Sequence, residues 1–77
     1  MASFKDLSEG LAILGKYAKY GMDSTAMGAD NGEIFFYVAQ EDLKPDSIDG
    51  QKLQTLGFEP HEGCKLNNGK NWSILVL

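Results

Sequence analysis

Two carboxylates in the first half of the chain have the spacing of a site that could move protons or hold a cation. Asp30 and Glu33 flank Asn31-Gly32. An Asn-Gly pair is typical of a two-residue β-hairpin turn, so the two carboxylates would face each other across neighbouring strands. Together with His61, they are the residues that a small hydrolase or nuclease would use. Two solvated turn carboxylates explain the same pattern, and we expect no catalytic residues.

His61 and Cys64 form a His-x-x-Cys pair, with Glu59 and Glu62 beside it. A structural zinc site takes four ligands, usually with a second pair of cysteines, and this chain has one cysteine and one histidine. Cys–His nucleophilic catalysis needs a third orienting group, for which the sequence gives no signal. We therefore expect no metal, no cofactor and no enzymatic activity. A lone cysteine also excludes an intramolecular disulfide, which favours a reducing compartment.

The acidic residues are concentrated in the middle of the chain. The net charge is −4, from seven lysines, no arginine and eleven acidic residues, of which nine lie in residues 21–62 beside only two lysines. Such a charge argues against direct binding of nucleic acid. A solvated loop is one interpretation, and a surface complementary to a basic protein is another. Four of the acids surround Lys44, namely Glu41, Asp42, Asp46 and Asp49.

Length and hydropathy set further bounds on the class of protein. The 77 residues, 43% of them hydrophobic, allow one domain over residues 1–77 with a modest core. The apolar runs, Ile34–Ala39 and Ile74–Leu77 among them, are far shorter than the roughly 20 residues of a membrane-spanning helix. Charge also begins too early for a secretory signal. We expect a cytoplasmic protein with no membrane partner.

Two helices are expected to position these residues. Apolar residues recur at spacings of three and four from Ser3 to Tyr20, with Ser3 as the N-cap and Gly21 as the stop. Gly10 and Gly15 inside this helix indicate either close packing or a marginal helix. A shorter helix is predicted over Ser47–Leu56, with three inward residues, Ile48, Leu53 and Leu56.

Two hairpins are expected to complete the fold. The first pairs Ser24–Asp30 with Glu33–Ala39. The second Asn-Gly turn, Asn68-Gly69, is predicted to pair about Phe58–Asn67 with Lys70–Leu77, and the proline in the first of these strands favours an edge position. The order α-β-β-α-β-β is typical of an α+β fold, in which a four-stranded antiparallel sheet carries both helices on one face.

Each of the two hydrophobic strands carries apolar residues on both of its faces. Phe35 and Tyr37 alternate with the Ile34-Phe36-Val38 set, and Leu75 and Leu77 alternate with the Trp72-Ile74-Val76 set. Two helices can cover only one face of a sheet, so we expect an open apolar face that binds a partner, unless the tails or the 41–45 loop cover it. The candidate partner-binding residues are Glu41, Asp42, Asp46, Asp49, Asp30, Glu33, Phe35, Tyr37 and Leu75.

Four stretches resemble an uncharacterised family of small phage and prophage proteins. They are Leu14-Gly15-Lys16-Tyr17, Ala29-Asp30-Asn31-Gly32-Glu33-Ile34-Phe35, Leu53-Gln54-Thr55-Leu56-Gly57-Phe58 and Trp72. The family pattern has His-Asp where this chain has Asn31-Gly32, so any chemistry of that pair would be missing here. The resemblance implies a mobile-element context and no known activity.

Two functional hypotheses follow. The first is a non-enzymatic phage or prophage protein that binds another protein stoichiometrically and inhibits a host defence or nucleic-acid enzyme through its acidic surface. The alternative is a structural or assembly module that self-associates, for example as a homodimer, through Phe35, Tyr37, Leu75 and Leu77 on the open sheet face.

Overall fold

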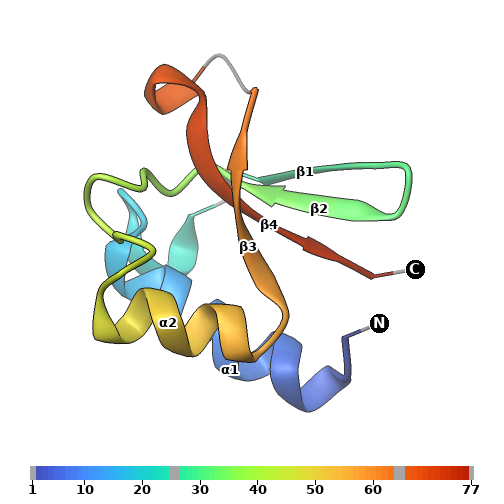
Figure 1. The fold of residues 1–77 in the computed structure, drawn as a ribbon. Helices are drawn as coiled ribbons and strands as arrows, with labels where there is room; N and C mark the ends of the chain where they lie inside the picture. The colour runs from blue at the N-terminus through green and yellow to red at the C-terminus, as the bar shows by residue number, and fades with distance from the viewer. Residues whose placement is uncertain (1, 25–26, 64–65, 77) are drawn as a thin grey trace.

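The computed structural model describes residues 2–24, 27–63 and 66–76. Its elements are α1 (Phe4–Tyr17), η1 (Gly21–Asp23), β1 (Met27–Asp30), β2 (Glu33–Phe36), α2 (Ile48–Thr55), β3 (Phe58–Glu62), η2 (Leu66–Gly69) and β4 (Lys70–Leu75). The strands form one antiparallel sheet in the order β1-β2-β4-β3, with both helices on one face (Figure 1). The predicted α+β fold is therefore confirmed. Within the described residues, no helix is long and apolar enough to cross a membrane.

Helix α1 begins where the sequence predicts and ends three residues earlier. The Ser3 side chain accepts a hydrogen bond from the Asp6 amide at 3.0 Å, which is the expected N-cap. At the other end Ala18 is already extended, and Gly21 has a positive φ in the following short turn instead of capping the helix. The chain turns back here so that the Met22 side chain lies against Gly15.

The N-cap of α2 is Ser47, one of the two residues, Asp46 and Ser47, that the sequence offers for it. The Ser47 hydroxyl accepts a hydrogen bond from the Gly50 amide at 3.0 Å. Leu53 and Leu56 are buried, as predicted. Ile48 is 89% exposed, so its predicted inward position is wrong. The inward face of α2 begins instead at Gly50, whose missing side chain lets the helix lie directly against the Lys44 carbonyl.

The core lies between the helices and one face of the sheet. Phe58 of β3 and Trp72 and Ile74 of β4 are at most 1% exposed, and Leu53 of α2 and Leu43 of the 39–47 loop are fully buried. The Trp72 indole donates to the Leu43 carbonyl at 3.1 Å, so its buried N–H has a partner. The loop thus closes the end of the core between β2 and α2.

The first hairpin has the register that its two-residue turn predicts, but its second strand, β2, ends at Phe36 and not at the predicted Ala39. Asp30 pairs with Glu33 and Gly28 with Phe35. The two turn residues, Asn31 and Gly32, both have positive φ, as a type I′ turn requires. The same register predicts residue 26 as the partner of Tyr37, and residue 26 lies outside the described residues.

The second hairpin differs from the prediction. Lys70 pairs with Glu62, not with Asn67, so the connection is a long loop rather than a two-residue turn. Pairing Phe58 with Ile74 places both on the core face, and this burial outweighs the local turn preference. The Asn71 side chain supports the longer loop, since it donates to the Leu66 carbonyl at 3.0 Å.

The two glycines inside α1 give a paired stability prediction. A methyl group at Gly10 would overlap the ring of buried Phe58, which has no space to move. At Gly15 it would meet only the end of the Met22 side chain, which is 70% exposed and can turn away. We expect Gly10→Ala to lower the free energy of unfolding by about 2 kcal/mol. Gly15→Ala should raise it by up to about 1 kcal/mol through helix propensity.

Urea denaturation of the two variants and the wild type would measure both changes. The same substitution in the same helix makes each variant the control of the other. Equal effects at the two positions would show that contact with Phe58 does not decide the role of Gly10.

Candidate functional site

Both α1 and α2 lie on one face of the sheet, and in the described part of the chain neither covers the opposite face (Figure 1). We call it the open face, and the strand register assigns its residues. Every charged residue at these positions is acidic, and no lysine is among them. Its apolar part is Phe35, Tyr37 and Leu75, of which Leu75 is 51% exposed. The ten positions of the open face are Gly28, Asp30, Glu33, Phe35, Tyr37, Glu59, His61, Asn71, Ser73 and Leu75.

At the centre of the open face two rings lie over β4, the strand between β2 and β3. Phe35 of β2 and His61 of β3 have ring centroids 4.6 Å apart, although β4 runs between their strands. Beneath them Asn71 and Ser73 of β4 are each 1% exposed. Their small polar side chains let the rings meet above the strand, so the centre is an aromatic surface over buried polar groups.

Two further contacts fix side chains on this face. The Ser73 hydroxyl donates to the Glu33 carboxylate at 2.9 Å. Because Ser73 pairs with Phe35 across the sheet, this hydrogen bond holds the carboxylate close to Phe35. Gly28 leaves room for the Tyr37 hydroxyl, because a Cβ at Gly28 would lie 3.3 Å from it. The acidic and aromatic groups are therefore placed by their neighbours on the sheet.

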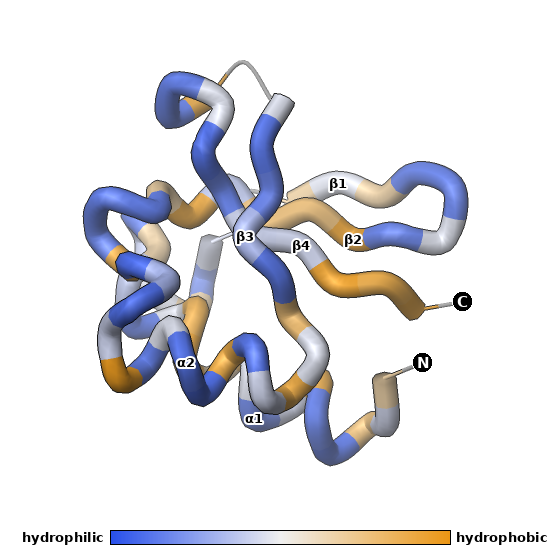
Figure 2. The backbone as a smooth tube through the Cα atoms, viewed as in Figure 1, coloured by the Kyte–Doolittle hydropathy of each residue, from blue (hydrophilic) through white to orange (hydrophobic). Residues whose placement is uncertain are grey.

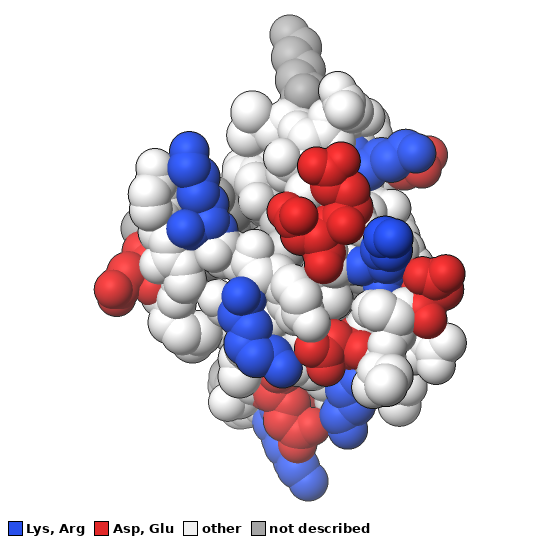
Figure 3. Space-filling view, turned by 90° about the vertical axis from the view of Figure 1, so that its left-hand side faces the viewer, with Lys and Arg blue, Asp and Glu red and all other residues white. Residues whose placement is uncertain are grey.

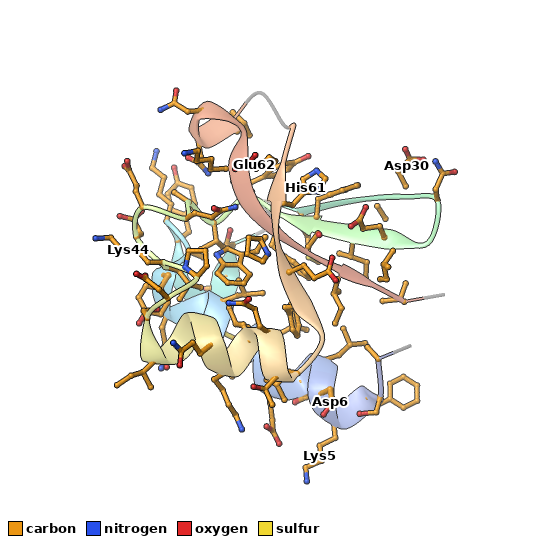
Figure 4. The ribbon with its side chains drawn as sticks, viewed as in Figure 1. Lys5, Asp6, Asp30, Lys44, His61 and Glu62 are labelled. Carbon is orange, nitrogen blue, oxygen red and sulfur yellow. The ribbon has the colours of Figure 1, made fainter. Side chains whose placement is uncertain are left out.

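Asp30, Glu33 and His61 do not form one catalytic centre. Glu33 pairs with Leu75 and His61 with Asn71, so the two lie four residues apart along β4, which is about 13 Å of strand, and on opposite sides of it. Figure 4 shows Asp30 at the tip of the β1–β2 hairpin, well away from His61 on β3. Groups this far apart cannot act on one substrate atom.

Of the predicted His61–Cys64 pair, Cys64 lies outside the described residues. In the part of the chain that the structure describes, no three His, Cys, Asp or Glu residues lie close enough to hold a metal ion. The His61 ring instead contacts Phe35.

The acidic loop, residues 39–47, lies at another edge of the molecule. Glu41, Asp42 and Asp46 are exposed there, and within the described residues none of their carboxylates makes an ion pair. Hydrogen bonds hold the loop, including one that the Gln40 side-chain amide donates to the Asn71 carbonyl at 2.6 Å. Figure 3 shows acidic and basic groups interspersed on the face that includes this loop. The loop therefore presents acids beside lysines, not a broad surface of one sign.

Asp49, the fourth residue of the predicted acidic segment, makes contacts within the protein. Its carboxylate accepts hydrogen bonds from the Tyr17 hydroxyl at 2.6 Å and from the Lys16 ammonium at 3.2 Å, so it joins α2 to α1. Chiefly the Tyr17 hydrogen bond, and then that of Lys16, holds the pKa of Asp49 below its ordinary value of 3.8. The same hydrogen bond raises the pKa of Tyr17.

The structure thus brings together five of the nine predicted partner-binding residues, Asp30, Glu33, Phe35, Tyr37 and Leu75. Sequence reasoning missed Glu59 and His61 as members of the same surface. Both residues alternate with buried Phe58 along β3, which indicates that they face away from the core. The wrong register predicted for the second hairpin hid this relation.

Asp49 gives a prediction about pH. Because folding lowers its pKa, this carboxylate stabilises the folded state above the ordinary pKa of Asp, and the contribution is lost as pH falls through the lowered value. Asp49→Asn should therefore be less stable than the wild type at pH 7, and the gap should close as pH falls below about 4. Urea denaturation at several pH values measures it, with Asp46→Asn as a control at an exposed carboxylate. A gap that stays constant down to about pH 2 would contradict this role.

Comparison with protein-family models, with curated proteins and with solved structures found no match to this chain. No relative therefore supplies a function. What the protein does has to be inferred from the chemistry of its surfaces, and the open face is the surface on which most of the predicted residues meet.

Proposed function

We propose that this protein acts by binding another protein, and that the open face docks on a basic surface of that partner. The observation that carries the proposal is the composition of the face. Aromatic rings occupy its centre, Leu75 adds an exposed aliphatic group, and all of its charged positions, Asp30, Glu33 and Glu59, are acidic. Aromatic residues are enriched in protein interfaces, and a complementary charge guides the encounter and selects the partner.

The kind of partner follows from the chemistry of this face. Carboxylates beside aromatic rings suit Lys and Arg, which pair with the carboxylates and lie on the rings. Enzymes that act on nucleic acids line their grooves with such residues. A phage or prophage protein that blocks a host enzyme of this class would need this surface and no catalytic group of its own.

Self-association through the open face is the second candidate, favoured by exposed Leu75 and half-buried Phe35 and Tyr37. Charge weighs against it, since a face-to-face dimer would bring the three carboxylates of each copy together in a partly desolvated interface. A basic partner gains from the same charges. We therefore place a heterologous partner before a second copy.

The test compares two triple variants with the same change of net charge. The face variant carries Asp30→Asn, Glu33→Gln and Glu59→Gln, and the amide oxygen that Glu33→Gln introduces can still accept from Ser73. The loop variant carries Glu41→Gln, Asp42→Asn and Asp46→Asn. Each is used with the wild type to capture proteins from a bacterial lysate, and the captured protein is purified and recombined to measure affinity and stoichiometry by sedimentation.

We expect an equimolar complex that the loop variant keeps and the face variant weakens by at least about tenfold, with an affinity that falls as salt is added. Weakening by the loop variant alone would move the binding surface to the acidic loop. A chain that captures no protein stoichiometrically would overturn the proposal. Concentration-dependent dimers of the wild type without any partner would favour the second candidate.

A further inference from the structure

The sheet has two free edges, and they differ. In β3 the backbone N–H and C=O groups of Glu59 and His61 bond to β4. The backbone groups of the alternate residues, Phe58, Pro60 and Glu62, therefore point outward. Pro60 has no N–H to donate, and β3 is hydrophilic along most of its length (Figure 2). A proline and charged residues are the usual means of blocking an edge strand.

Strand β1 has no proline, and its one charged residue, Asp30, bonds to β2 rather than outward. The type I′ turn makes Asp30 and Gly28 the residues that bond to β2, so the N–H and C=O groups of Met27 and Ala29 point outward. Within the described residues, β2 is the only strand that pairs with β1. Figure 2 shows β1 as pale to apolar up to its hydrophilic end at the turn, and the strand contains no proline and no lysine.

Different surfaces adjoin this edge on the two faces of the sheet. On the helix side Met27 borders an apolar groove of about 190 Å³ between α1 and the first hairpin, lined also by Leu11, Leu14, Met22 and Phe36. On the other side the edge borders the open face at Gly28 and Asp30. A strand added here would therefore place alternate side chains in an apolar groove and on an acidic aromatic face.

We infer that β1 accepts an antiparallel strand from the partner, with apolar residues alternating with Lys or Arg. The inference rests on the proposed function and specifies how the partner binds. The apolar residues would pair with Met27 and Ala29 and point into the groove. The basic residues would lie beside Gly28 and Asp30, where the absence of a side chain at Gly28 gives access to Tyr37.

Charge selects this occupant over a second copy of the chain. The β1 strand of another copy would bring Asp30 to a face that already carries three carboxylates, and it has no cation to offer. Pairing of two four-residue strands also buries far less surface than the roughly 1,200 Å² of a stable interface. A peptide in which apolar and basic residues alternate can place its apolar side chains in the groove and its basic side chains on the open face.

The test uses the peptide Lys-Val-Lys-Ile-Lys-Val, blocked at both ends, with the full-length wild-type protein. In antiparallel pairing the apolar residues donate to β1, and the lysine amides point to solvent. N-methylation of the apolar residues should therefore weaken binding by at least about tenfold. N-methylation of the lysines should change it by less than about twofold. The peptide Lys-Lys-Lys-Val-Ile-Val, with equal charge and no alternation, should bind more weakly than the parent.

Hydrogen exchange observed by NMR gives a second readout that requires no variant. The amides of Met27 and Ala29 should become protected when the peptide is added, while those of Gly28 and Asp30 are already protected in the free protein. Equal affinity of the two N-methylated peptides, the reverse selectivity, or unchanged exchange at Met27 and Ala29 would each overturn strand addition. Absence of parent-peptide binding would also overturn it.

These failures are separable from failure of the proposed function. If the peptide shifts resonances of Glu33, Phe35 and Tyr37 without protecting the β1 amides, the open face binds cationic groups and strand addition alone is wrong. If the captured partner is lost in the face variant but the peptide does not bind, the same separation holds.

Discussion

Burial of Phe58 opposite Ile74 is the constraint on which the surface of this protein depends. The pairing sets the register of β3 against β4, and Gly10 of α1 makes room for the ring. Because side chains alternate along a strand, fixing Phe58 on the core face also fixes Glu59 and His61 on the opposite one. A contact that exists for packing therefore determines which charges the open face presents.

The first hairpin could be predicted from sequence because its information is local. Asn31 and Gly32 tolerate the positive φ values of a type I′ turn, and the strands on both sides agree with that turn. The second hairpin has the same Asn-Gly signal and a different outcome. There the local preference competes with burial of Phe58, more than ten residues from its partner Ile74, and the non-local contact prevails.

The candidate site divides in the same way. Alternation along β2 placed Phe35 and Tyr37 on the open face, and the turn placed Asp30 and Glu33 beside them. The sequence groups Asp49 with the exposed acids because it lies close to them along the chain. Its carboxylate instead accepts a hydrogen bond from Tyr17 on the other helix. A contact between residues 32 positions apart leaves no periodic trace in a single sequence, so only the structure could separate this carboxylate from the exposed ones.

The open face also shows how a small sheet can keep one side uncovered. Asn71 and Ser73 in its middle strand have hydrogen-bond partners of their own, and the rings of Phe35 and His61 cover them. No buried side-chain nitrogen or oxygen is left unpaired in the described residues, so these side chains do not need a second layer to supply a partner. Carboxylates around the rings oppose association with another copy. A face whose buried side chains already have hydrogen-bond partners, and whose carboxylates repel a second copy, is suited to a partner of opposite charge.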